Sequence, residues 1–238
     1  MTLDEIWGLK FLGKSYHDEC IRWAEDQLCA GIDAPSVRNL ARLGVAGRPD
    51  RSKIEHFFVH ALQELGESRP DRDSGLRRYA LFLCHQIIDR RRDPEQAANQ
   101  LADINRYECD NASIYSLWHR VVEDIHLLYR GDYAYENSDL TLKNKNSFIE
   151  KLARHFILLL NNNVPGDFLS LSVCKSCQKL VRTQYRPLSG ENPLQELLIK
   201  VGLKQPKYAT VCASCGSRDV THLYSNEQRE NALALLGK

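Results

Sequence analysis

Two short cysteine motifs in the last third of the chain constrain its folding more than any other feature. Cys174 and Cys177 form one Cys-x-x-Cys pair, and Cys212 and Cys215 form a second. Two such pairs, each turned tightly enough to aim both sulfurs at one point, supply the four thiolates of a tetrahedral metal site. In a compartment that keeps cysteines reduced, the pattern is typical of metal binding rather than of disulfides. The sequence therefore predicts one structural Zn²⁺ per chain.

The segments that follow the two pairs have the alternation of β-strands. They read KLVRTQYR after the first pair and DVTHLYS after the second, and Gly216 permits a left-handed turn directly after Cys215. With these motifs, residues 172–224 resemble the zinc-ribbon modules, which implies a β-ribbon around a closed metal site. The 34 residues between Cys177 and Cys212 exceed the roughly 15–20 that are common between such pairs. The stretch NPLQELLIKVG predicts that the extra length is a helical insert.

Two features suit contact with a protein partner. The predicted insert carries an apolar stripe at helical spacing, made of Leu194, Leu197, Leu198 and Val201. A helix this short is not stable alone, so the stripe is expected to dock on the helical domain or on a partner. The polar segment RGDYAYENSDLTLKNKNS carries Tyr133 and Tyr135, and a plain surface excursion is its alternative interpretation.

Apolar residues recur at helical spacing through most of residues 1–160, with capping signals at the segment ends. The segment LRRYALFLCHQIIDRRRDP is apolar around most of its circumference, which predicts the central helix of a bundle. The segment NNNVPGD marks a boundary, and SNEQRENALALLGK predicts a terminal helix. The expected fold is mainly α: a helical bundle in residues 1–163, followed in residues 164–238 by a small zinc-ribbon β module with a helical insert and a C-terminal helix.

The run YHDECIRWAEDQLCAGIDAPSVRNLARLG combines an aromatic residue, Trp-Ala, Gly-x-Asp and a Pro-Ser…Leu-Ala-x-Leu spacing. With this pattern, residues 15–130 resemble small, uncharacterised all-helical bacterial proteins, some of which are encoded near toxin or phage-defence loci. The resemblance implies a helical domain and carries over no functional residue.

Catalytic signals are weak. The sequence has no Gly-x-Gly-x-x-Gly, no phosphate-binding loop, no Gly-x-Ser-x-Gly and no His-Glu-x-x-His motif. Two predicted helices carry rows of ligand-type side chains expected on the helix exterior: His56, His60 and Glu64, and His119, Glu123 and His126. His85 is expected in the core, and His222 is disfavoured as a ligand because four cysteines already fill the shell. Enzyme activity is left open, with the balance against it.

The remaining cysteines are scattered singly and are expected to be reduced and largely buried: Cys20, Cys29, Cys84 and Cys109. The longest apolar stretch, FILLL, is far short of a bilayer span, and the amino terminus does not read as a secretory signal. These observations predict a cytoplasmic protein with no membrane partner.

Two functions follow as hypotheses. The first is a non-catalytic zinc-binding adaptor, or an immunity or defence-type protein, that acts through protein–protein contacts. The second is nucleic-acid binding by the ribbon, where Arg182, Gln184 and Arg186 alternate so as to point the same way. Net charge favours the first, because the whole chain carries only +1 and residues 1–163 hold 22 basic against 25 acidic side chains.

Overall fold

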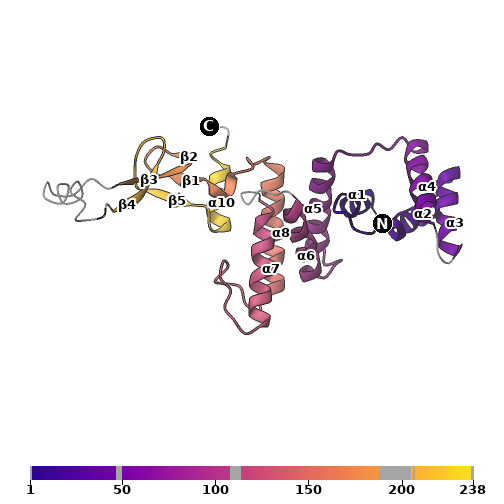
Figure 1. Cartoon of the computed structure of the whole chain (residues 1–238), viewed down its shortest axis with the longest axis horizontal. Coiled ribbons are helices and arrows are strands. Elements are labelled where there is room, and N and C mark those ends of the chain that lie inside the picture. The colour runs from indigo at the N-terminus through magenta and orange to yellow at the C-terminus, as the bar shows by residue number, and fades with distance from the viewer. Residues whose placement is uncertain (1, 47–49, 108–113, 188–204, 206, 237–238) are drawn as a thin grey trace. The chain divides into compact units, whose positions relative to one another are not determined.

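The computed structural model describes residues 2–46, 50–107, 114–187, 205 and 207–236 (Figure 1). The predicted helical insert, with Leu194, Leu197, Leu198 and Val201, lies outside the described residues, as does Cys109. The described chain divides into two compact units, one of Met1–Cys109 and Leu117–Arg154 and the other of Asp110–Ser116 and His155–Lys238.

The first unit is helical. Its elements are α1 (Leu3–Phe11), α2 (His17–Cys29), α3 (Pro35–Leu43), the short 3₁₀ turn η1 (Gly44–Ala46), α4 (Arg51–Glu64), α5 (Arg72–Ile88), α6 (Pro94–Tyr107), α7 (Ser116–Tyr129) and most of α8 (Lys145–Asn161). Side-chain caps explain where several of them begin: Asp50 accepts the Ser52 N–H at 2.9 Å, and Asp71 accepts the Ser74 N–H at 2.9 Å. Helix starts are thus encoded locally.

Aromatic side chains fill the core between α1, α2 and α4. Trp23 meets the fully buried Phe58 edge to face, with ring centroids 5.5 Å apart, and Trp7 contacts the same ring at 5.7 Å. Where α1 packs on α5, the Tyr79 ring lies directly over Gly8. A Cβ atom at Gly8 would be only 2.1 Å from Tyr79 Cγ. The packing of α1 on α5 therefore requires glycine at this position.

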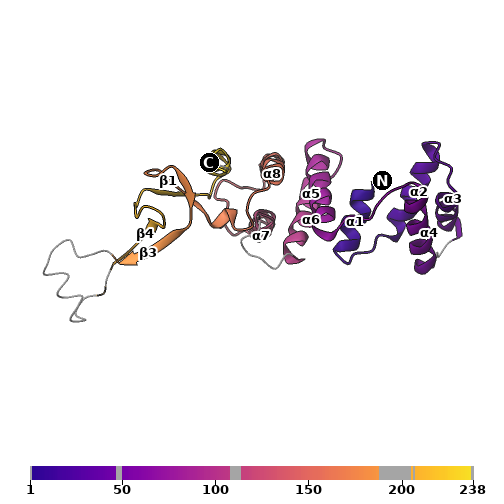
Figure 2. The same cartoon turned by 90° about the horizontal axis from the view of Figure 1, so that it is seen from above.

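The described residues of the second unit form two small antiparallel sheets. Their strands are β1 (Ser172–Cys174), β2 (Lys179–Val181), β3 (Thr183–Pro187), β4 (Tyr208–Cys212) and β5 (Val220–His222), preceded by the 3₁₀ turn η2 (Phe168–Ser170). One sheet has the order β2-β1-β5, and the other is the pair β3-β4. Figure 1 and Figure 2 both show β3 and β4 running side by side away from the three-stranded sheet. We call this pair the β3–β4 arm.

A buried polar network fixes the last helix, α10 (Asn226–Leu233), to the end of α8 within the second unit. Arg229 Nε donates to His155 Nε2 at 3.0 Å, and Arg229 Nη1 donates to the carbonyl oxygen of Leu223 at 3.0 Å. His155 Nδ1 lies 3.1 Å from Glu230 Oε1. Burial, together with the Arg229 charge, lowers the His155 pKa to about 4.

The predicted fold class, mainly α with a small β module at the cysteines, is confirmed. Among the described residues, no helix has the length and apolarity needed to cross a membrane. His56, His60 and Glu64 are exposed, as expected from the helical projection. The prediction for His85 is wrong: its side chain is exposed rather than in the core, because it lies off the buried face of α5 that holds Leu83 and Cys84.

Candidate metal centre

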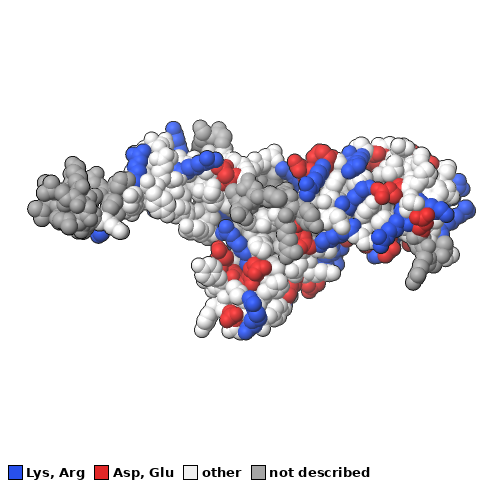
Figure 3. Space-filling view, in the orientation of Figure 1, with Lys and Arg blue, Asp and Glu red and all other residues white. Residues whose placement is uncertain are grey.

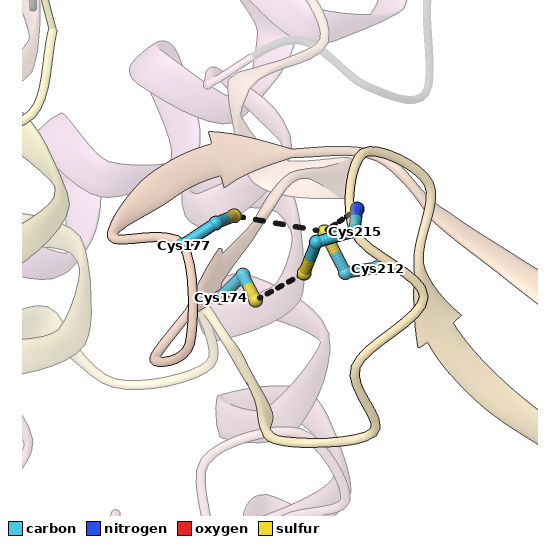
Figure 4. Close-up of side chains that lie close together, drawn as sticks. All are labelled: Cys174, Cys177, Cys212 and Cys215. Atoms are coloured by element: carbon cyan, nitrogen blue, oxygen red, sulfur yellow. Dashed lines mark hydrogen bonds between the residues drawn. The ribbon is translucent and has the colours of Figure 1, made fainter.

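Four cysteine side chains converge where the strands of the second unit turn (Figure 4). Cys174 ends β1, and Cys177 lies in the turn that leads into β2. Cys212 ends β4, and Cys215 lies in the turn that precedes β5. Because β1 pairs with both β2 and β5, the two turns are brought to the same place.

The four sulfurs have the spacing of ligands around one ion. All lie within 4.8 Å of one another, with Cys174 Sγ 3.6 Å from Cys215 Sγ and Cys177 Sγ 3.9 Å from Cys212 Sγ. A tetrahedral ion with metal–sulfur bonds of about 2.3 Å requires sulfurs about 3.8 Å apart. Disulfide sulfurs are only about 2.0 Å apart. The donor set therefore fits a four-coordinate metal ion, and the prediction of a metal cluster at these cysteines is confirmed at this level.

Each turn closes with a residue in the left-handed region. Gln178 has a φ of 56° after Cys177, and Gly216 has a φ of 75° after Cys215. The Gln178 N–H donates to the Cys174 carbonyl oxygen at 2.9 Å, and the Gly216 N–H donates to the Cys212 carbonyl oxygen at 2.9 Å. The two turns thus have the same backbone design, although only one of them uses glycine.

Hydrogen bonds join the two turns directly to each other. The side chains of Ser176 and Ser217 meet at 2.7 Å, and the Lys175 N–H donates to the Asp219 carbonyl oxygen at 2.9 Å. A hydrogen bond from the Cys177 N–H lowers the Cys174 pKa to about 7. Burial raises the pKa of the neighbouring Cys177 to about 12, so the thiols of the cluster differ in acidity; the thiolate is the form that binds a metal.

Within the described ranges, the other histidine and cysteine side chains do not join the cluster. His222 Nδ1 instead lies 2.9 Å from Ser172 Oγ. In the described part of the chain, the four cysteines are the group of side chains placed to bind a metal ion. Burial raises the pKa of Cys20 to about 12 and raises that of the buried Cys84, as expected for inert thiols. Cys29 is exposed, which corrects the expectation of burial, because it ends α2 on the side away from the core.

The residues predicted for nucleic-acid contact are only partly available. Arg182 forms an ion pair with Asp167, with Nε and Nη2 at 3.0 and 2.5 Å from Oδ2. Gln184 and Arg186 are exposed on β3 and contact each other at 3.4 Å. The β3–β4 arm also exposes Tyr185 and Tyr208, by 79% and 60%, two residues that the sequence reasoning missed. Their alternation within β-strands was the signal that could have found them.

The loop after α7 presents both of the tyrosines predicted for partner contact. Tyr133 is 92% exposed and Tyr135 is 85% exposed. The loop is held by Asp124, which is 1% exposed and accepts hydrogen bonds from three successive backbone N–H groups of residues 135–137, at 2.6, 3.2 and 2.8 Å. The Asn137 side chain adds a fourth donor at 2.8 Å. We call residues 133–137 the tyrosine loop.

Comparison with protein-family models, with curated proteins and with solved structures finds no match for this chain.

Proposed function

We propose that this chain is a non-catalytic, zinc-binding adaptor that binds another protein through the tyrosine loop. The anchoring of this loop by buried Asp124 carries the proposal. Burying a carboxylate is costly unless it accepts hydrogen bonds. The hydrogen bonds that Asp124 accepts come from the loop, and they hold this surface loop in one conformation. Such a loop loses little conformational entropy when it binds.

The side chains on the loop suit a protein interface. Tyrosine is enriched among the residues that dominate binding energy, because it combines a large apolar ring with a polar hydroxyl. Tyr133 and Tyr135 stand next to an ion pair between Arg120 and Glu136 at 3.5 Å, so the surface combines aromatic and charged groups. Mixed surfaces of this kind are typical of specific, non-obligate protein interfaces.

Zinc is the metal that the four-sulfur site favours. Thiolate ligands select zinc over magnesium or calcium, which require oxygen ligands. Four protein ligands leave no open position for water, so the ion would stabilise the ribbon rather than catalyse a reaction. The proposal includes a reducing compartment such as the cytoplasm. The link to toxin or phage-defence loci stays a prediction.

Site-specific photo-crosslinking tests the adaptor function. A benzophenone amino acid replaces Tyr133, or Tyr135, in the full chain at its native expression level. The matched control replaces Tyr224, which is 77% exposed but lies in the second unit. We expect one protein to crosslink at the loop positions and not at the control, and to be lost when Asp124→Asn releases the loop. Equal crosslinking at loop and control positions would contradict the proposal.

A second candidate, nucleic-acid binding, is favoured by the β3–β4 arm. The register pairs Tyr185 with Thr210 and Pro187 with Tyr208, which puts both exposed tyrosines on one face of the arm. These exposed aromatic rings are suited to stacking on bases. Arg186, which strand alternation places on the opposite face of the arm, and Lys207 supply positive charge for phosphates. Against this function, acidic and basic side chains are interspersed over the first unit on the face drawn in Figure 3.

Fluorescence anisotropy with a labelled single-stranded oligonucleotide separates the two candidates. If the arm binds nucleic acid, affinity falls steeply between about 50 mM and 200 mM salt and falls again in a double variant, Tyr185→Ala with Tyr208→Ala. The adaptor function predicts no such binding, together with unchanged crosslinking from the tyrosine loop in the same double variant.

A further inference from the structure

A cavity of about 680 Å³ lies in the first unit, where the turn between α5 and α6 meets the start of α8. Four of its lining side chains are cationic: Arg90, Arg91, Arg92 and Lys143. The two acidic side chains in the lining are Asp93 and Glu150. Cations that line one cavity repel one another. If nearby carboxylates do not neutralise them, they favour an anionic ligand.

Both acidic groups are already engaged. Asp93 Oδ1 accepts the Gln96 N–H at 2.8 Å and so caps α6. Glu150 accepts from Arg154 at 2.8 Å, and this hydrogen bond, with a smaller contribution from the Arg90 charge, holds the Glu150 pKa below its usual value. Arg92 is engaged as well, because it pairs with Glu5 at 2.5 Å.

Three cations, Arg90, Arg91 and Lys143, therefore remain at the cavity, and the nearby acidic side chains compensate their charge only in part, because Glu150 acts on Arg90 without forming an ion pair. Among the described residues, the carboxylate that pairs with the Arg91 guanidinium is that of Asp89, at the long distance of 3.8 Å. Within the described ranges, neither Arg90 nor Lys143 has a carboxylate within ion-pair distance. All three side chains are exposed and border the cavity from two different elements.

The backbone at Arg90 supports a role for its side chain. Glycine takes the left-handed position that ends four other helices of the first unit, at Gly13, Gly31, Gly66 and Gly131. After α5 that position is held by Arg90, with a φ of 56°. The N–H groups of Arg90 and Arg91 bond back to the last turn of α5, at 3.1 and 3.0 Å. Glycine adopts a positive φ with less strain than arginine does. The arginine side chain is therefore not needed to end the helix, which indicates another role for it.

We propose that this cavity binds a phosphorylated small molecule, with Arg90, Arg91 and Lys143 around the phosphate. Guanidinium groups suit phosphate because they present paired donors, and lysine adds a point charge. Asn146 offers a neutral amide, and Ile87 and Pro94 form an apolar part of the wall. The volume falls within the roughly 300–1,000 Å³ of small-molecule sites and exceeds what a bare phosphate would fill. The ligand therefore includes an organic group. This site is independent of the tyrosine loop.

The test is a titration of the zinc-loaded, full chain with candidate ligands. Binding is measured by NMR of the backbone amides and by calorimetry. The probes are inorganic phosphate, pyrophosphate, ADP and a short single-stranded oligonucleotide. The deciding variant is Arg90→Gly, because glycine relieves the left-handed strain while it removes the cation. Lys143→Ala removes a second cation. Lys151→Ala removes an exposed lysine of α8 that does not border the cavity and serves as the matched control.

We expect ADP to shift amide signals around Arg90 and Asn146 and to bind more tightly than inorganic phosphate. Binding should weaken roughly tenfold or more in Arg90→Gly and in Lys143→Ala, as for loss of a charge-assisted hydrogen bond, and should persist in Lys151→Ala. Arg90→Gly should melt at the wild-type temperature or above it. The proposal is overturned if neither ADP nor pyrophosphate binds, if Arg90→Gly binds as the wild type does, or if only the oligonucleotide binds at these residues.

Discussion

The buried network at the end of α8 predicts how the second unit responds to acid. His155 is 2% exposed and has a pKa of about 4 in the folded chain, against about 6.5 when unfolded. Below about pH 6.5 the unfolded chain therefore takes up a proton that the folded chain does not, and stability falls with pH until about pH 4. The full effect corresponds to about 3 kcal/mol, of which about 2 kcal/mol is lost between pH 7.5 and pH 5.

The matched variant is His155→Gln, which cannot titrate. Its amide can still accept a hydrogen bond from Arg229 and donate one to Glu230, so the fold is retained. Urea titrations at about pH 7.5 and pH 5, followed by NMR amide signals of α10, measure the stability of this part of the chain for both proteins.

We expect the wild type to lose about 2 kcal/mol more than His155→Gln over this interval. Loss of zinc in acid affects both proteins equally, so the difference between them isolates the histidine. The reasoning is refuted if both lose the same stability, or if an NMR titration places the His155 pKa near its ordinary value.

Three further predictions concern the metal centre, the core and the tyrosine loop. Cys212→Ser should reduce bound zinc from one ion per chain to none by elemental analysis and unfold the ribbon, while tryptophan fluorescence stays unchanged because all three tryptophans lie in the first unit. Gly8→Ala should lower the free energy of unfolding by about 3 kcal/mol in a fluorescence-detected urea titration, since its methyl group collides with the buried Tyr79 ring; an unchanged midpoint would show that the ring can move aside. Asp124→Asn should speed hydrogen exchange of the loop amides at least tenfold, because an amide replaces one of the acceptor oxygens. Unchanged exchange there would mean that other contacts hold the loop.

The metal cluster could be predicted from the sequence because the features that define it lie within a few neighbouring residues. The spacing of Cys174 and Cys177 fixes a tight turn, and alternation after each pair predicts strands, which the structure has as β2, β3 and β5. Strands β1 and β4, each of which ends at the first cysteine of a pair, were not predicted. Both pair with strands that are distant in the sequence, β1 with β5 and β4 with β3, and such pairing leaves no mark on the local sequence pattern.

The contacts that give the candidate binding surfaces their form could not be predicted, because they join residues far apart in sequence. Arg182 and Asp167 are 15 positions apart, so alternation along the strand could not reveal that this arginine is already paired. Arg229 and His155 are 74 positions apart. Asp124 reads in the sequence as one more polar residue on a helix, and only the return of the chain shows which amide groups it holds.

The way Asp124 holds the tyrosine loop has a consequence for how related chains could diverge. Three of its four hydrogen-bond donors are main-chain N–H groups, which every residue except proline possesses. The shape of the loop is therefore almost independent of the side chains at positions 133, 135 and 136. Mutations there can change which surface the loop recognises while the scaffold stays the same. Natural selection can thus retarget this loop one residue at a time, with each intermediate still folded.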